Sequence, residues 1–289
     1  LERLNIKIKY NTIVEKISKN NNNFFIKTNK QLFESDYVII ATGGLSYKNL
    51  GSTGDGYKFA KNFNHKITKT FPSITALKIN SKLLKNISGV RQEAIVRIIS
   101  DNKNIKEYYE ELLFTDYGVS GSAILQISRF AIENLLKKNK VEISIQFTKP
   151  KITKQKVKEI LNRQIKLSSG KNLKSVLLWF LNTTLIENLF GGLENKNCNN
   201  ITEKELESII KIITDTRFEI TGFKEWEQAQ ITAGGININE INPKTLESKK
   251  EKGLYFCGEV LDIDGDCGGF NLSWAWSSGY LAGKVLKSN

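Results

Sequence analysis

Three glycine-rich segments contain the residues whose types and spacing best suit chemistry. The first, Ala41–Gly44, follows the continuous apolar run Tyr37–Ile40. Such a run favours a strand buried on both faces of a parallel sheet, and ligands of open α/β sheets bind at the carboxyl edge of these strands. Glycines at that edge let a ligand approach the backbone because they carry no β-carbon. The segment therefore indicates a ligand site, with a plain tight turn as the alternative.

The second segment, Gly51–Gly56, precedes a helix that we expect from Asp55 to about Asn64. Free backbone amides at a helix N-terminus suit an anion or a carbonyl oxygen. The segment lacks the Gly-Lys-Ser/Thr ending of a Walker loop and matches GxGxxG poorly. A glycine-rich loop capped by Thr53 or Asp55 explains it equally well.

The third segment is the densest. A short buried strand, Leu254–Cys257, ends in Gly258 and Glu259, and a second glycine pair precedes a helix expected over 271–286. A carboxylate at such a strand end is placed to accept hydrogen bonds from sugar-like hydroxyls, and amides at the helix start stabilise negative charge on a ring. The alternating acids Asp262, Asp264 and Asp266 are also typical of a calcium loop. The helix–loop–helix context and final Glu of an EF-hand are absent, so we expect no metal site.

Other reactive residue types support no chemistry in the sequence. His65 is the single histidine, and we expect it to be structural, because no acid–base partner is identifiable for a hydrolytic triad. The three cysteines form no CxxC pair, which argues against a zinc or thioredoxin-like site. The sequence identifies no catalytic residue.

Composition excludes several classes of protein. With 289 residues, 40% hydrophobic and 25% charged, the chain is globular rather than disordered. No apolar run approaches the roughly 20 residues of a membrane helix, and no signal peptide is visible, so we expect a cytoplasmic protein without a membrane partner. The net charge of +13 suits nucleic acid, but only six of the 43 basic residues are Arg and the Lys are scattered. We therefore expect no nucleic-acid partner.

Local patterns predict the elements that position these segments. Alternation over Ile6–Tyr10 predicts a strand, and two runs around Asn20–Asn23 predict a hairpin. Short strands and one helix near 123–138 are expected up to a boundary at Lys149-Pro150. Helices are expected over 153–166, 171–190 and 202–213, with Thr153 and Thr202 as N-caps. The polar loop over 191–200 is expected to be exposed.

Six segments follow one another along the chain: Ala41–Tyr47, Gly51–Tyr57, Leu113–Gly121, Ile231–Ile236, Gly258–Gly265 and Gly268–Leu272. Together and in this order they resemble the BaiN-like, aminoacetone-oxidase-like family of NAD(P)/FAD-dependent oxidoreductases. The resemblance implies an α/β fold: an FAD-binding Rossmann-like domain, with its N-terminal βαβ missing, and an inserted β-rich plus helical domain. The FAD domain would cover 1–72 and 230–289, and the insertion 73–229, β-rich over 73–150 and helical over 151–213.

The resemblance also implies a cofactor site, with FAD as cofactor, NAD(P)H as candidate electron donor and a small molecule as substrate. The backbone of Val14 would meet the adenine, Glu259 the ribityl chain, and the amides of Asn271 and Leu272 the pyrimidine edge of the flavin. The complete implied set is Val14, Ala41, Thr42, Gly43, Gly44, Gly258, Glu259, Asp262, Gly268, Gly269, Phe270, Asn271 and Leu272.

One departure from the family affects the expected activity. The family begins with a βαβ unit carrying GxGxxG, which this sequence lacks, and the chain starts at Leu1 and contains no Met. We expect it to begin about one hundred residues late. The predicted function is an FAD-dependent oxidoreductase that transfers a hydride between flavin and a small organic substrate or NAD(P)H. The alternative is a truncated, catalytically inactive remnant that binds a nucleotide or a protein.

Overall fold

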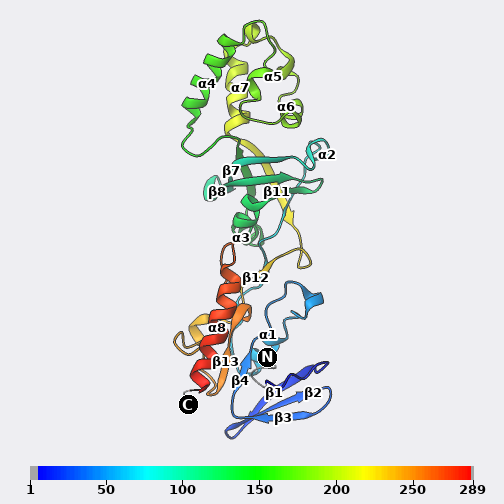
Figure 1. Cartoon of the computed structure of the whole chain (residues 1–289), viewed down its shortest axis with the longest axis vertical. Coiled ribbons are helices and arrows are strands. Elements are labelled where there is room, and N and C mark those ends of the chain that lie inside the picture. Colours follow the sequence, from blue (N-terminus) through cyan, green and yellow to red (C-terminus); the bar gives the residue numbers. More distant parts are fainter. Residues whose placement is uncertain (1–5, 288–289) are drawn as a thin grey trace. The chain divides into compact units, whose positions relative to one another are not determined.

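The computed structural model describes residues 6–287, and the chain divides into two compact units (Figure 1). Unit 1 consists of the segment ending at Phe71 together with the segment starting at Ile231. Unit 2 is the intervening segment, Pro72–Gln230. The three glycine-rich segments all belong to unit 1, so the candidate site is built from this unit.

Unit 1 opens with a three-stranded antiparallel meander, β1 (Val14–Asn20), β2 (Asn23–Thr28) and β3 (Leu32–Ser35). The hairpin prediction is confirmed, since β1 and β2 pair on either side of a tight asparagine turn. The strand expected over Ile6–Tyr10 is wrong, because these residues form no ladder and Ile6 and Tyr10 are 50% and 74% exposed. Alternation alone makes no strand where no partner strand supplies hydrogen bonds.

A parallel pair of strands forms the centre of unit 1. In it β4 (Val38–Ile40) lies beside β13 (Leu254–Phe256), with Ile40 opposite Phe256. Ile40 and Phe256 are buried, but Ile39 is 38% exposed. The expectation that this strand is buried on both faces is therefore wrong, because among the described residues only one face of β4 is packed against a core.

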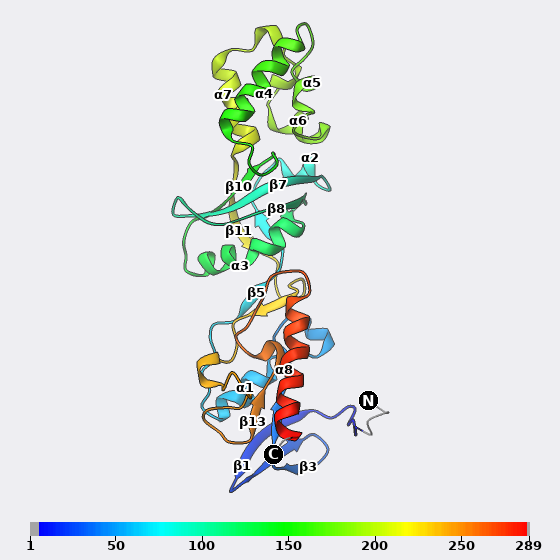
Figure 2. The ribbon, with the colours of Figure 1, turned by 60° about the vertical axis from the view of Figure 1, so that its left-hand side comes forward.

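Helices α1 (Asp55–Asn62) and α8 (Phe270–Lys287) complete unit 1, as Figure 2 shows. Helix α1 buries Phe59 and Ala60. Helix α8 turns its small residues Ser278 and Ala282 inward, at 1% and 0% exposure. Its other face carries large apolar side chains that are exposed to solvent in this structure: Phe270, Leu272, Trp276 and Tyr280.

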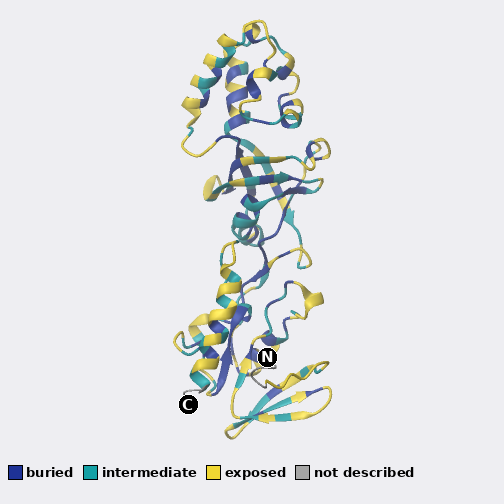
Figure 3. Ribbon diagram, in the orientation of Figure 1, coloured by how far each residue is buried: buried dark blue, intermediate teal, exposed yellow. Residues whose placement is uncertain are grey.

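Unit 2 begins with a closed six-stranded barrel in the order β10-β11-β6-β9-β8-β7. Its core is dark blue in Figure 3 and includes Val96, Leu112 and Ile143, each fully buried. A β-carbon at Gly118 would overlap the carbonyl oxygen of Leu77, so a glycine is needed to let β9 pack against β6. The elements are β6 (Leu77–Ile79), α2 (Leu84–Ile87), β7 (Arg91–Ser100), β8 (Lys103–Phe114), β9 (Gly118–Ser120), α3 (Ser122–Leu136), β10 (Val141–Gln146) and β11 (Thr216–Phe223). Strand β12 (Ile231–Ala233) opens the second segment of unit 1 and pairs with β5 (Phe71–Ser73), which spans the end of the first segment.

Four helices follow the expected boundary at Lys149-Pro150: α4 (Lys154–Leu167), α5 (Lys174–Leu177), α6 (Thr183–Leu189) and α7 (Glu203–Thr214). The caps at Thr153 and Thr202 are confirmed, the latter as a full capping box. The single helix expected over 171–190 is wrong: it is split into α5 and α6, because Asn182 starts a new helix by accepting from Leu185 N–H at 3.0 Å. The loop over 191–200 is only partly exposed, since it buries Glu194 and Cys198.

Candidate functional site

The carboxyl ends of β4 and β13 meet at one edge of the parallel pair. Because the two strands run in the same direction, Ala41–Gly44 and Gly258-Glu259 leave the sheet side by side. The N–H of Cys257 donates to the carbonyl oxygen of Ile40 at 3.1 Å, which continues the ladder up to the point of departure. The first and third glycine-rich segments therefore lie together at this edge.

Thr232 ties three distant segments together at this edge. Its N–H donates to Oε1 of Glu259 at 2.7 Å. Its hydroxyl oxygen accepts from the N–H of Leu45 at 2.7 Å and from that of Ser46 at 3.2 Å. Thr232 is 1% exposed and was not singled out from the sequence. The only signal for it was that its segment, Ile231–Ile236, is one of the six resembling the family.

Gly44 is placed where no side chain fits. A β-carbon at this residue would lie 2.6 Å from Oε1 of Glu259 and would also overlap the hydroxyl of Thr232. The glycine therefore lets the turn after β4 close onto the carboxylate from β13. At Gly44 the missing side chain therefore makes room for protein atoms and not for a ligand. For this residue the structure agrees with the alternative interpretation, a tight turn.

Burial shifts the pKa values of two ionisable groups, Glu259 and Tyr57. Burial raises the pKa of the Glu259 carboxyl, and the charge of Asp264 adds to the effect. Burial also raises the pKa of Tyr57, with further contributions from Glu259 and Asp262. The hydroxyls of Thr42 and Tyr57 make no hydrogen bond with any residue in the described range, as is also true of Ser100 and Thr115 in unit 2. Because protein atoms cover these hydroxyls, they offer no surface to a ligand.

The loop before α8 leaves open space beside its backbone. Gly268 and Gly269 have φ of +121° and +93°, and no heavy atom lies within 4 Å of a β-carbon built on Gly269. The Asn271 side chain holds this loop in place, accepting from Gly265 N–H and donating to Gly265 O, both at 2.9 Å. The first amides of an α-helix have no partner within the helix, so the amides of Asn271 and Leu272 are available to a ligand.

The remaining expected site residues lie in different places. Asp262 lies within the third segment, after Glu259, and its N–H donates to Ile236 O at 3.0 Å. Val14 begins β1 and packs against the core cluster that contains Ile40. Within the described residues no hydrogen bond joins Val14 to the groups around Glu259. The strand-end residues thus gather around Glu259 and Thr232, while Val14 is connected to them only through the core.

His65 has acid–base partners, which corrects the expectation that none exists. Its Nε2 lies 2.7 Å from the hydroxyl oxygen of Ser248, and its Nδ1 lies 3.0 Å from Oε2 of Glu240. The Ser248 oxygen also accepts the N–H groups of Lys250 and Glu251 at 3.0 and 2.9 Å. Its own hydrogen is therefore directed at Nε2, and the Nδ1–H donates to Glu240.

This arrangement has the residue types of a hydrolytic triad but not its chemistry. Ser248 is 7% exposed and His65 is 3% exposed, so no substrate reaches the hydroxyl. Both lone pairs of the Ser248 oxygen are occupied by backbone amides, which makes it a structural clamp. Burial lowers the pKa of His65, so its ring is held neutral. The structural interpretation of His65 is consistent with this geometry.

Two other kinds of functional feature are absent from the described residues. Over residues 6–287 no group of three or more His, Cys, Asp and Glu side chains is arranged to hold a metal ion. In the same range no helix has the length and apolar character needed to cross a bilayer.

The parallel strand pair, its glycine-rich carboxyl edge and the helix that follows define a Rossmann-like α/β protein. Comparison with known families agrees: the model of the HI0933-like protein Rossmann domain matches residues 1–285. The chain belongs to this family, which confirms the expected fold class and makes it a member of a flavoprotein-related group of oxidoreductases.

Named relatives cover nearly the whole chain. It is 31% identical over 288 residues to a 3-dehydro-bile acid delta(4,6)-reductase of Clostridium scindens, covering 99% of this chain and 70% of that protein. It is 30% identical over 293 residues to the ribosomal RNA dihydrouridine synthase of Escherichia coli, covering 99% and 69%. The same enzyme of Haemophilus influenzae is 32% identical over 261 residues, covering 89% and 62%.

Proposed function

We propose that this protein is an FAD-dependent oxidoreductase that reduces a carbon–carbon double bond conjugated to a carbonyl group. The names of the relatives support this reaction class. A delta(4,6)-reductase of a 3-dehydro-bile acid and a dihydrouridine synthase both saturate such a bond, in a steroid and in a pyrimidine. The match to a reductase over 99% of the chain disfavours the alternative of an inactive remnant.

The residues at the carboxyl edge of β4 and β13 fit FAD. The observation that carries the proposal is the half-buried carboxylate of Glu259 at the carboxyl edge where Ala41–Gly44 and Gly258 leave the sheet side by side. The hydroxyls of a ribityl chain can donate hydrogen bonds to such a carboxylate. The open backbone at Gly269 provides an approach for a planar ring.

Each residue then has a distinct task. Glu259 accepts hydrogen bonds from ribityl hydroxyls, and the strand end Ala41–Gly44 lines the cofactor. The amides of Asn271 and Leu272 and the positive end of the α8 dipole favour negative charge on the ring. Bound FAD supplies hydride transfer, with NAD(P)H as the proposed electron donor.

A flavin titration of three variants tests the assignment of Glu259. Glu259→Ala is expected to weaken FAD binding about ten- to a hundredfold, the loss for a hydrogen bond to a charged acceptor. Glu259→Gln keeps an oxygen that accepts from the Thr232 N–H, so this variant distinguishes a loss of folding from a loss of cofactor binding. Glu15→Ala, an exposed carboxylate on β1, is the control and should leave binding unchanged. Wild-type affinity in Glu259→Ala removes Glu259 from the site.

The reaction class has its own measurement. With FAD added, oxidation of NADH or NADPH should depend on an acceptor whose double bond is conjugated to a carbonyl. The matching acceptor with an isolated double bond should remain unreacted, because hydride addition to the β-carbon needs the carbonyl to take up the charge. Equal consumption with both acceptors contradicts the proposed reaction.

A further inference from the structure

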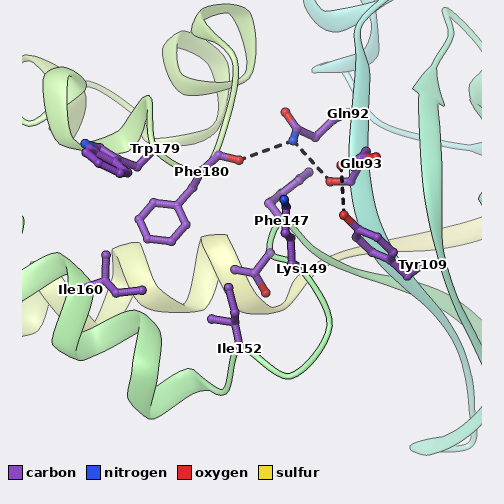
Figure 4. A pocket seen from close by; sticks show the side chains of 10 residues that line it. Gln92, Glu93, Tyr109, Phe147, Lys149, Ile152, Ile160, Trp179 and Phe180 are labelled. Carbon is purple, nitrogen blue, oxygen red and sulfur yellow. Dashed lines mark hydrogen bonds between the residues drawn. The ribbon is translucent and has the colours of Figure 1, made fainter.

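The hollow between the barrel and the helices of unit 2 does not select a class of ligand. It has a volume of about 320 Å³, and its lining sets one cation, Lys149, against one carboxylate, Glu93. Figure 4 shows that two of its other polar groups bond within the protein. The Tyr109 hydroxyl donates to Oε2 of Glu93 at 3.0 Å, and the Gln92 amide donates to the carbonyl oxygen of Phe180 at 3.5 Å. The residues that carry a further role lie in unit 1, on helix α8.

One face of α8 carries three side chains that bond to two glycine turns. Asn271, Trp274 and Ser278 are spaced by three and four residues, so they project from the same side of the helix. Asn271 bonds to both polar backbone groups of Gly265, each at 2.9 Å. Trp274 and Ser278 together bond to both polar backbone groups of Gly258. A single face of the helix therefore holds both turns.

The turn at Gly258 depends on these bonds for its conformation. Its φ is +76°, in the left-handed region, and a glycine loses more conformational freedom than any other residue when it is fixed there. The Trp274 indole N–H donates to Gly258 O at 3.2 Å, and the Gly258 N–H donates to the Ser278 hydroxyl oxygen at 2.9 Å. The Ser278 hydroxyl donates its own hydrogen to Trp274 O at 2.7 Å, which leaves its oxygen to accept. The peptide planes on both sides of Gly258 are thus held by one helix.

We infer that Trp274 and Ser278 are positioning residues that aim the Glu259 carboxylate at the ribityl chain of the cofactor. The carbonyl of Gly258 and the N–H of Glu259 belong to one rigid peptide plane, so a bond to that carbonyl fixes the direction in which the Glu259 side chain leaves the backbone. The carboxylate must also meet the Thr232 N–H at 2.7 Å, and a hydrogen bond weakens steeply when its angle changes. The inference rests on the proposed function, and it gives a role to two side chains that act only through Gly258.

Replacing Trp274 by Phe separates this role from folding. The change removes the indole N–H and keeps an aromatic ring. Gly258 O retains the N–H of Leu261 at 3.3 Å, so no buried acceptor is left unpaired and the fold should persist. In a titration of the full chain, affinity for FAD should fall about two- to tenfold, the effect of one ordinary hydrogen bond. Trp276→Phe is the matched control, because Trp276 is 80% exposed on the other face of the same helix, and it should bind FAD like the unaltered chain.

Lumiflavin distinguishes positioning from a general loosening of the site. It has the flavin ring with a methyl group in place of the ribityl chain, so it offers no hydroxyl to Glu259. Trp274→Phe should leave the dissociation constant of lumiflavin unchanged, while riboflavin and FAD bind about two- to tenfold more weakly. Equal weakening of all three flavins, or an unchanged affinity for FAD, overturns the inference.

Amide hydrogen exchange tests the same role without any flavin. In Trp274→Phe the amides of Gly258 and Thr232 should exchange about two- to tenfold faster, because one lies in the loosened turn and the other bonds to the carboxylate that the turn aims. The Val38 amide, which donates to Gly253 O at 3.0 Å, reports the stability of unit 1 as a whole. Equal acceleration at Val38, or none at Thr232, overturns the inference and leaves the cofactor proposal standing. If the unaltered chain binds no flavin, the proposed function fails, and this measurement still decides the role of Trp274.

Discussion

Replacing Thr232 by Val tests whether its hydroxyl holds the candidate site together. Valine has the shape of threonine but no hydroxyl, so the N–H groups of Leu45 and Ser46 lose their acceptor. The bond from Thr232 N–H to Glu259 remains, because it belongs to the backbone. An unsatisfied buried donor costs about 1–3 kcal/mol. Since Leu45 is only half-buried and the Ser46 bond is the longer one, we expect a total loss of about 2–4 kcal/mol.

Urea denaturation of unit 1 measures this loss. With Trp179 and Trp226 replaced by Phe, fluorescence comes only from Trp274 and Trp276 in α8. For a urea dependence of about 2 kcal/mol per molar, the midpoint should fall by roughly 1–2 M. Following one unit avoids applying a two-state analysis to a chain that divides into two.

Thr232→Ser is the control for this experiment. It keeps the hydroxyl and removes one methyl group, so the expected loss is about 0.5–1.5 kcal/mol. A valine variant with wild-type stability would show that water or backbone movement satisfies Leu45 and Ser46. A serine variant as unstable as the valine variant would attribute the effect to packing. Either result refutes the assigned role of the hydroxyl.

Three other outcomes are expected. Ser278→Ala should destabilise unit 1 by about 1–3 kcal/mol, because the buried N–H of Gly258 loses the acceptor that lies 2.9 Å away. Ser277→Ala, on the exposed side of α8, should hardly change the urea midpoint in the same assay. Because burial lowers the pKa of His65, its stabilising contribution is present above the ordinary value of about 6.5 and is lost as pH falls through the lowered pKa. His65→Gln should flatten the fall of the urea midpoint at acid pH. An unchanged slope would assign this pH dependence to other groups. Gly269→Val should lose bound flavin after desalting while circular dichroism stays near wild type, and full flavin retention would make the loop an ordinary turn.

Local signals in the sequence were sufficient for several elements. The asparagine turn between β1 and β2, the capping box at Thr202 and the apolar run before Ala41 each predicted an element that the structure contains. These patterns act over a few residues, so a single sequence carries them completely. The split between α5 and α6 shows the limit, since Asn182 is an N-cap signal that helical spacing on either side obscured.

Long-range contacts were beyond the reach of local patterns. The closed barrel, the clamp formed by His65 and Ser248, and the link from Thr232 to Glu259 each join residues far apart in sequence. Nothing in the neighbourhood of Thr232 distinguishes it from other threonines. Only the ordered resemblance to a family pointed to its segment, and the role of its hydroxyl required the three-dimensional structure.

Strands β4 and β13 are separated in the sequence by the whole of unit 2, and this separation has a consequence for the order of folding. Their pairing closes a loop of roughly 200 residues, which is entropically costly. The two ends of unit 2 are held together within that unit, where Gln230 N–H donates to Ile74 O at 3.2 Å. Once unit 2 has folded, the effective loop shrinks to roughly 60 residues, which lowers the closure cost by about 1 kcal/mol. During synthesis β4 cannot pair until β13 has been made, so the edge proposed to bind FAD forms only after unit 2 has been synthesised.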